Sequence, residues 1–287
     1  MKKLACFFMM IFLLQINVTA QENGEDDEWE EWEREFDVFN WYKESRPFIE
    51  LNYGLSEPKH KKIDGTFSDA GLAEIKIGYN SMDKYEDYIY ELDKRYLFLS
   101  TLSSDIGSGE SAGSLESKLI RFGLGARSGY GYRIGSVGIF PYTQDDFVWS
   151  KLNMDEFPEK ESDLEIINRY EGAFRFGTAN AGGISLSYNS FFSVNAGYEA
   201  AVIFPRYLVW KNFLSLAIKG IGIGSIDFFV KEIMEASPAS GPVVNFFLKN
   251  AFSYGFYLLQ RDNMNWPFST ETPLTYETFK VGVSFSF

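Results

Sequence analysis

The last nine residues of the chain, 279–287, alternate strictly between two kinds of side chain. The apolar set is Phe279, Val281, Val283, Phe285 and Phe287, and the small or charged set is Lys280, Gly282, Ser284 and Ser286. Successive side chains of a β-strand point to opposite faces, so this period of two predicts a strand with one apolar face. The apolar face continues to the terminal residue, and the fold must place it against something other than water.

The N-terminus has the pattern of a cleaved export signal. Lys2 and Lys3 precede a short apolar run over residues 4–14, and Val18-Thr19-Ala20 offers small residues for cleavage. Cys6, the only cysteine, lies inside this segment. The prediction is therefore a signal peptide over residues 1–20 and a mature chain without a thiol, which excludes disulfides and zinc–thiolate sites.

Alternation recurs from residue 47 onward. Clear strand patterns cover 49–54, 73–79, 88–98 and 120–127, and weaker ones cover about 131–142, 164–178, 183–190, 193–204 and 212–223. In the third pattern an apolar face runs through Tyr88, Tyr90, Leu92, Tyr96 and Phe98. With the C-terminal segment the total is ten strands, and eight is equally compatible with the weaker patterns.

The predicted links between strands alternate in length. Long polar connections are expected at 55–70, 103–116 and 143–163, and short turns at 80–84, 128–131 and 178–182. No segment after residue 20 is predicted to be a membrane-spanning helix, yet 18% of the residues are aromatic. An antiparallel barrel can present such rings to lipid, and an even number of strands leaves both chain ends on one side.

The chain resembles bacterial outer-membrane β-barrel proteins in three features: the signal sequence, the succession of predicted strands joined by short and long links, and the last strand that ends on an aromatic residue. The resemblance implies an all-β transmembrane barrel over residues 47–287, located in the outer membrane of a Gram-negative cell after export. It also implies that the strand ending at Phe287 closes the barrel and is read by the barrel-assembly machinery. Lipid and lipopolysaccharide are the surroundings expected for such a protein. The resemblance transfers no catalytic or ligand-binding residue.

Residues 21–46 form an acidic segment ahead of the predicted barrel. Residues 21–37 carry ten carboxylates and one Arg34, a composition typical of a solvated tail. Trp29, Trp32, Phe36 and Phe39 nevertheless fall on one face of a helix. Two interpretations follow: a flexible periplasmic tail, or an amphipathic helix that docks on the barrel mouth or on a basic periplasmic partner.

A helical hairpin is predicted before the last strand, over about 225–262. Ile226, Phe229, Val230 and Ile233 recur at helical spacing, and a second apolar run begins after Pro242. A purely structural interpretation is a cap on the barrel or a plug in the lumen. The functional ones are a gate, a lipid-facing platform or a subunit interface.

Charged residues on the polar faces of the strands predict a charge network inside the barrel. Its candidate members are Glu50, Glu74, Lys76, Arg121, Arg127, Glu171, Arg175 and Lys280. A barrel of eight to ten strands is just wide enough for side chains to fill it, so opposite charges are expected to pair there. Asn52 and Lys219 are further lumen candidates.

Three functions remain compatible with the sequence. The first is a structural or interaction protein with a largely filled lumen, and the second is a narrow gated channel for small solutes. The third, a lipid-acting enzyme, is disfavoured because His60 is the only histidine and lies in a basic loop. No cofactor or metal site is expected, and the net charge of −13 argues against nucleic-acid binding.

Overall fold

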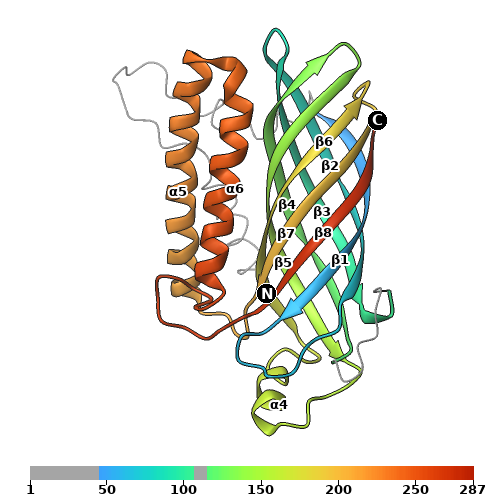
Figure 1. The fold of residues 1–287 in the computed structure, drawn as a ribbon, viewed down its shortest axis with the longest axis vertical. Coiled ribbons are helices and arrows are strands. Elements are labelled where there is room, and N and C mark those ends of the chain that lie inside the picture. The colour runs from blue at the N-terminus through green and yellow to red at the C-terminus, as the bar shows by residue number, and fades with distance from the viewer. Residues whose placement is uncertain (1–44, 107–114) are drawn as a thin grey trace, which may run out of the picture. The chain divides into compact units, whose positions relative to one another are not determined.

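The computed structural model describes residues 45–106 and 115–287, so the predicted signal peptide and nearly all of the acidic segment lie outside the described residues. Eight antiparallel strands form a closed barrel in sequential order (Figure 1). They are β1 (Arg46–Lys59), β2 (Ala70–Glu86), β3 (Ile89–Ser103), β4 (Ser117–Ile134), β5 (Val137–Met154), β6 (Phe174–Tyr188), β7 (Phe192–Ile203) and β8 (Leu274–Ser286). The prediction of a barrel with eight to ten strands is confirmed at eight.

The barrel is closed by the C-terminal strand, as the alternation over 279–287 predicts. β8 pairs with β7 on one side and with β1 on the other, in register Tyr53↔Val281 and Ala196↔Val281. At the very end the backbone N–H of Phe287 donates to the carbonyl of Pro47 at 2.9 Å. The first and last strands therefore form the seam that makes the sheet continuous and leaves no free edge.

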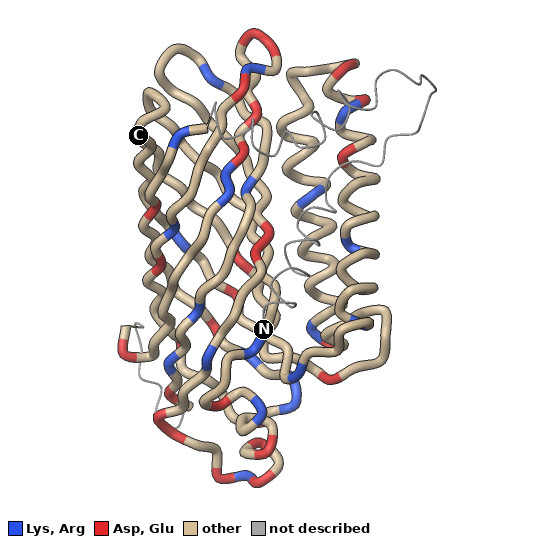
Figure 2. Tube along the Cα trace, turned by 180° about the vertical axis from the view of Figure 1, so that it is seen from behind, with Lys and Arg blue, Asp and Glu red and all other residues tan. Residues whose placement is uncertain are grey.

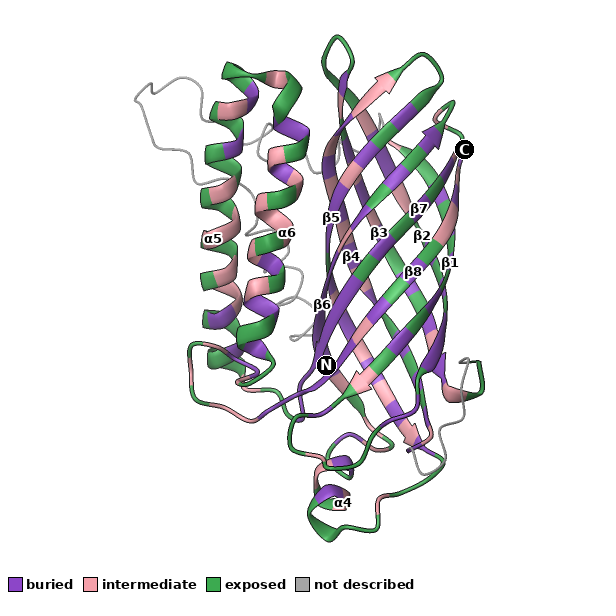
Figure 3. Ribbon diagram, viewed as in Figure 1, coloured by how far each residue is buried: buried purple, intermediate pink, exposed green. Residues whose placement is uncertain are grey.

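The polarity of this barrel is inverted relative to a soluble protein. Apolar side chains point outward, with Leu97 67% and Ile77 56% exposed, whereas Arg121 and Lys76 are fully buried inside. Figure 2 shows that charged residues gather in the loops at the end of the barrel with α4 (Glu161–Ile167). Figure 3 shows buried and exposed residues alternating along the strands. An apolar outer band around a polar interior is the pattern of a transmembrane barrel.

Short and long connections lie at opposite ends of the barrel. The links of residues 87–88, 135–136 and 189–191 are short, and they lie at the end where the described chain begins and where it stops. At the other end of the barrel lie the strand ends that residues 60–69, 104–116, 155–173 and 204–273 connect. The predicted alternation is therefore present, with different boundaries.

Three predicted turns and one predicted loop are wrong in detail. Residues 80–84, 128–131 and 178–182 lie within β2, β4 and β6, and most of 143–163 belongs to β5. Glycine, serine and asparagine suggested turns, but in a barrel a glycine also makes room for a neighbouring ring, as Gly131 does for Phe140. The acidic pair Asp145–Asp146 is tolerated in β5 because each carboxylate has a polar partner.

Some predicted strands also needed correction. Residues 131–142 contain the end of β4 and the start of β5, and 164–178 contain part of α4 and the start of β6. In β3 the side chains of Leu92, Tyr96 and Phe98 point into the barrel, while Leu97 and Leu99 face outward. Periodicity identified this strand but not which of its faces is inside, because both faces carry apolar residues.

The helical hairpin before the last strand is confirmed, but it is longer than predicted and begins earlier. It consists of α5 (Val209–Ala236), a short η3 turn (Pro238–Ser240) and α6 (Gly241–Gln260). The segment 212–223, predicted as a strand, is helical. The hairpin stands beside the barrel, with α6 against the outer side of β4–β7 (Figure 1). It therefore does not plug the lumen.

Candidate functional site

The centre of the barrel holds a network of ion pairs around Glu50. Arg127 donates to both of its carboxylate oxygens, from Nη1 at 2.9 Å and from Nη2 at 2.7 Å. Lys94 lies 3.6 Å away and Lys76 4.0 Å away, and the Asn195 amide donates at 3.2 Å. Two-point contact from a guanidinium fixes both the position and the orientation of the carboxylate.

A second centre forms around Glu199. Arg121 approaches its Oε1 at 2.7 Å and Lys280 its Oε2 at 2.5 Å. Lys280 also reaches Glu74 at 3.3 Å. Asn52 joins the two centres, because its amide donates to Glu50 and to Glu74 at 3.1 Å each.

Neutral side chains complete the network. The Gln144 carbonyl accepts from Lys76 at 3.0 Å and from Arg127, and its amide donates to Asp146 at 2.6 Å. The Tyr96 hydroxyl donates to the same Asp146 at 2.8 Å. The Arg127 guanidinium lies 4.3 Å from the ring centre of Tyr142. The buried charges in this network therefore have partners, which is the condition for keeping them in a low-dielectric interior.

The structure brings together six of the eight predicted network residues. They are Glu50, Glu74, Lys76, Arg121, Arg127 and Lys280. Glu171 lies elsewhere, at the long-connection end, where it accepts from the Met154 backbone N–H at 2.9 Å. Arg175 pairs in register with Ser150 on the lumen face of β6 and makes no ion pair within residues 45–106 and 115–287. Lys219, also a lumen candidate, lies on α5 outside the barrel.

Three charged members of the network were not predicted. Asp146 lies in a segment that the sequence predicts to be a loop, and Lys94 lies on the face of β3 that the sequence predicts to be apolar. Glu199 lies in one of the weaker strand patterns. These three residues lie on the same, inward face of the sheet as Arg127 and Lys280. The sequence shows the alternation along each strand, but which positions of neighbouring strands share a face is known only from the strand register.

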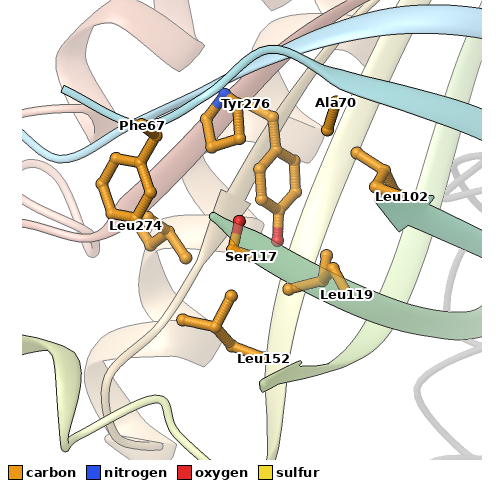
Figure 4. A pocket seen from close by; sticks show the side chains of 9 residues that line it. Phe67, Ala70, Leu102, Ser117, Leu119, Leu152, Leu274 and Tyr276 are labelled. Atoms are coloured by element: carbon orange, nitrogen blue, oxygen red, sulfur yellow. The ribbon is translucent and has the colours of Figure 1, made fainter. Parts of the chain in front are cut away.

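Two small cavities lie toward the two ends of the barrel. A cavity of about 10 Å³ at the long-connection end is lined by Phe67, Leu274 and Tyr276 among others (Figure 4). A second, of about 20 Å³ at the short-connection end, is lined by Asn80, Phe140 and Ser187 among others. Each has room for about one water molecule. The described residues contain no group of three or more side chains suited to hold a metal ion.

The long-connection end is closed by an apolar cluster. Phe67, Leu115, Ile167 and Tyr170 from the connections pack on the inward side chains of the strands, including Leu102. Ion pairs hold the connections to one another, such as Arg169 with Glu271 at 3.2 Å. The network is therefore shielded from this end of the barrel.

His60 is part of this closure and makes it sensitive to pH. Burial lowers the pKa of His60 from its ordinary value of 6.5, although its Nε2 lies 3.2 Å from the Thr272 carbonyl, a contact that raises the pKa. Below pH 6.5 the unfolded connection takes up a proton before the folded one does, so the closure loses stability as the pH falls.

We therefore expect the connections around His60 to be cut faster by a protease at pH 5.5 than at pH 7.5. The measurement is limited proteolysis of the folded protein with an acid-tolerant protease, corrected for the activity of the protease on an unstructured peptide. A His60→Gln variant is the control and should show no such difference. Equal cutting of the wild-type chain at both pH values would contradict the expectation.

A second cluster of polar groups joins the hairpin to the outer wall. Lys219 of α5 pairs with Asp145 of β5 at 2.6 Å, and the Asn180 amide of β6 donates to the same carboxylate at 2.5 Å. Asn250 of α6 donates to the Thr143 hydroxyl at 3.0 Å. We call these five residues the hairpin–wall cluster. The wall is recessed beside it, because a side chain at Gly182 would collide with Asn250.

The predicted assembly signal has the expected arrangement. Phe279 and Val281 are exposed on the outer face of β8, and the rings of Phe285 and Phe287 both contact Phe191. Val283 lies on the same face. Recognition of this strand by an assembly machinery stays a prediction.

Comparison with known proteins finds similarity in structure only. No protein-family model and no curated protein matches the sequence. Among solved structures, Neisserial surface protein A is 11% identical with a TM-score of 0.41, and the match covers 84% of this chain and 97% of that one. Ail, the attachment invasion locus protein of Yersinia pestis, is 10% identical with a TM-score of 0.32, over 85% and 99%. Both are eight-stranded barrels of the bacterial outer membrane, the class that the sequence resembles. The assignment of the barrel rests on its own strand pairing.

Proposed function

We propose that this chain is an outer-membrane β-barrel of structural or interaction type, which acts through its surfaces and not through its lumen. In this proposal the N-terminal signal directs export, and the 279–287 strand is recognised during assembly. The long connections face the outside of the cell, where they meet lipopolysaccharide. The acidic N-terminal segment remains in the periplasm and is available to a partner there.

The observation that carries the proposal is the filled lumen. Glu50, Arg127, Lys76 and Glu199 occupy the middle of the barrel and are each at most 1% exposed, and the apolar cluster closes one end. A solute path would require several of these ion pairs to separate together, at a cost of several kcal/mol for each buried charge left without a partner. Within residues 45–106 and 115–287, His60 lines neither of the two small cavities, so the proposal includes no enzymatic activity.

The alternative of a channel gated by the hairpin has less support. A gate must block the conducting path, whereas α6 contacts the outer side of the wall. The charged residues that would select an ion, such as Arg121, are held by Glu199 at 2.7 Å. Removing the hairpin therefore changes the lipid-facing side of the barrel and leaves the lumen as it is.

We expect the full chain to show no steady single-channel conductance in a planar bilayer. A variant that lacks residues 209–260, and thus α5 and α6, should be equally silent. Folding of both forms is checked by the shift in electrophoretic mobility between heated and unheated samples, and a porin in the same bilayers verifies detection. Steady conductance of the full chain would refute the filled-lumen proposal. Current only after the deletion would show that the hairpin keeps the barrel closed from outside, and would refute the proposal as well.

A further inference from the structure

The helix α5 has the length and composition of a membrane-spanning segment. Its most apolar stretch has a mean hydropathy of 1.7, and only 11% of that stretch is buried within the protein. At 1.5 Å per residue its 28 residues extend over about 40 Å, more than the ~30 Å of a hydrocarbon core. Trp210, Ile221 and Phe228 are at least 70% exposed. A water-exposed helix of this composition would be an aggregation hazard.

Charges in the central part of the hairpin are few and paired. Lys219 is the only charged residue within 212–226, and Lys249 is the only one within 242–260. Lys219 pairs with Asp145 of the wall, and Lys249 pairs with Asp227 at 2.5 Å. Within membranes, ionisable side chains are rare and are usually paired or turned toward the protein. The hairpin follows that pattern.

The hairpin also lies at the depth of the apolar band of the barrel. Its tip reaches the short-connection end, where the Tyr132 hydroxyl donates to the Ala239 carbonyl at 2.6 Å. Its base lies at the long-connection end, where the ring of Phe204, the residue after β7, packs near the ring of Phe176. The two helices therefore run along most of the height of the barrel, with α6 against β4–β7 and α5 on the far side of α6 (Figure 1).

We propose that the hairpin crosses the same bilayer as the barrel, and that lipid acyl chains cover the exposed face of α5. The inference rests on the proposed membrane location of the barrel and adds a helical element to its transmembrane part. The hairpin–wall cluster then serves as the attachment between the two. Where the hairpin covers the outer wall, the wall carries the polar residues Thr143, Asp145 and Asn180, and these residues are covered by the hairpin instead of by lipid.

Acyl chains can cover this face without any polar contact. Association of helices within a bilayer relies on close packing at small residues and on polar side chains that reach across the contact. On the exposed side of α5 the Ser225 hydroxyl already donates to the Ile221 carbonyl at 2.9 Å. Lys219 is likewise held by Asp145. At the centre of the face Ile221 is 72% exposed, and nothing lies within 4 Å of the place where a side chain at Gly220 or Gly224 would begin. Acyl chains can cover this uneven apolar surface without a polar partner.

The test uses the absence of competing thiols. In a full-length Cys6→Ser background, single cysteines are placed at Ile221 on the hairpin, at Leu97 on the barrel wall and at Glu156 in a long connection. Each is labelled with an environment-sensitive fluorophore, and the protein is reconstituted into vesicles whose phospholipids carry bromine on their acyl chains. We expect similar strong quenching at Ile221 and Leu97 and little at Glu156. A charged maleimide should react several-fold faster with the Glu156→Cys variant than with the other two.

The contrary outcomes separate the two proposals. Quenching at Leu97 without quenching at Ile221, with fast maleimide labelling at Ile221, would place the hairpin in water and overturn this inference alone. A third result is quenching at Leu97, no quenching of the fluorophore at position 221, no reaction of the charged maleimide there, and disulfides between copies of the Ile221→Cys variant. It would show that a second chain covers this face in place of lipid, and would also overturn this inference. Absence of quenching at Leu97 would refute the membrane location of the barrel itself. A second hairpin position, Phe228, guards against a local effect of one label.

Discussion

Replacing Glu50 by alanine is expected to lower the free energy of unfolding by about 3–5 kcal/mol, the usual cost of leaving buried charges without their partner. Glu50 is fully buried and neutralises Arg127 by a two-point contact, with Lys76 and Lys94 nearby. Its removal leaves three cations facing one another inside the barrel. The measurement is urea unfolding in lipid vesicles, followed by tryptophan fluorescence.

A matched control is the exposed ion pair between Glu57 and Lys59. Both side chains are more than half exposed, so Glu57→Ala should change the free energy of unfolding by less than about 1 kcal/mol. A Glu50→Ala variant as stable as the Glu57→Ala variant would show that water reaches the network and screens it. That result would also weaken the filled-lumen proposal, because hydrated charges imply a wider interior.

Replacing Asp145 by alanine is expected to destabilise the hairpin by about 3 kcal/mol if the hairpin lies in lipid, the order of cost for a lysine near the centre of a bilayer. The change leaves Lys219 without its 2.6 Å partner. In water the same change would cost no more than about 1 kcal/mol, because the ammonium would be hydrated. The measurement is the same unfolding experiment, combined with limited proteolysis of the hairpin.

The double variant Asp145→Ala, Lys219→Leu provides the control. It removes both charges, and we expect it to recover most of the stability lost by the single Asp145→Ala change. A double-mutant cycle with Lys219→Leu then gives the coupling between the two residues. A coupling near zero would contradict the role of the hairpin–wall cluster as an attachment.

The alternation of side chains made most of the barrel predictable. Period-two patterns located parts of β1, β2, β4 and β8, and the C-terminal pattern identified the strand that closes the barrel. Turn residues were less informative. Gly182 suggested a turn, yet it lies in β6 beside Asn250 of the hairpin, and such a long-range contact leaves no local trace in the sequence.

The segment 212–223 illustrates a limit of periodicity. Leu214, Leu216 and Ile218 alternate with smaller or polar residues, which favours a strand. A helix surrounded by lipid and protein can be apolar on every side, so its sequence need not show a period of 3.6. The choice of helix follows from the hairpin as a whole, in which α5 packs against α6 and the phenyl ring of Phe252 lies over Gly222.

The pattern of residues along the chain is enough to predict two-faced strands, a last strand that ends on an aromatic residue, and charges of both signs on the interior faces. These properties are local, because each depends on the parity of neighbouring positions along one strand. Which charges meet was decided by the tertiary structure. Glu50 and Arg127 lie on β1 and β4, and Glu199 and Lys280 on β7 and β8. Closure of the barrel and the register of its strands set these distances, and the packing of the hairpin on the wall sets the contact between Lys219 and Asp145. Neither arrangement can be read from one strand alone.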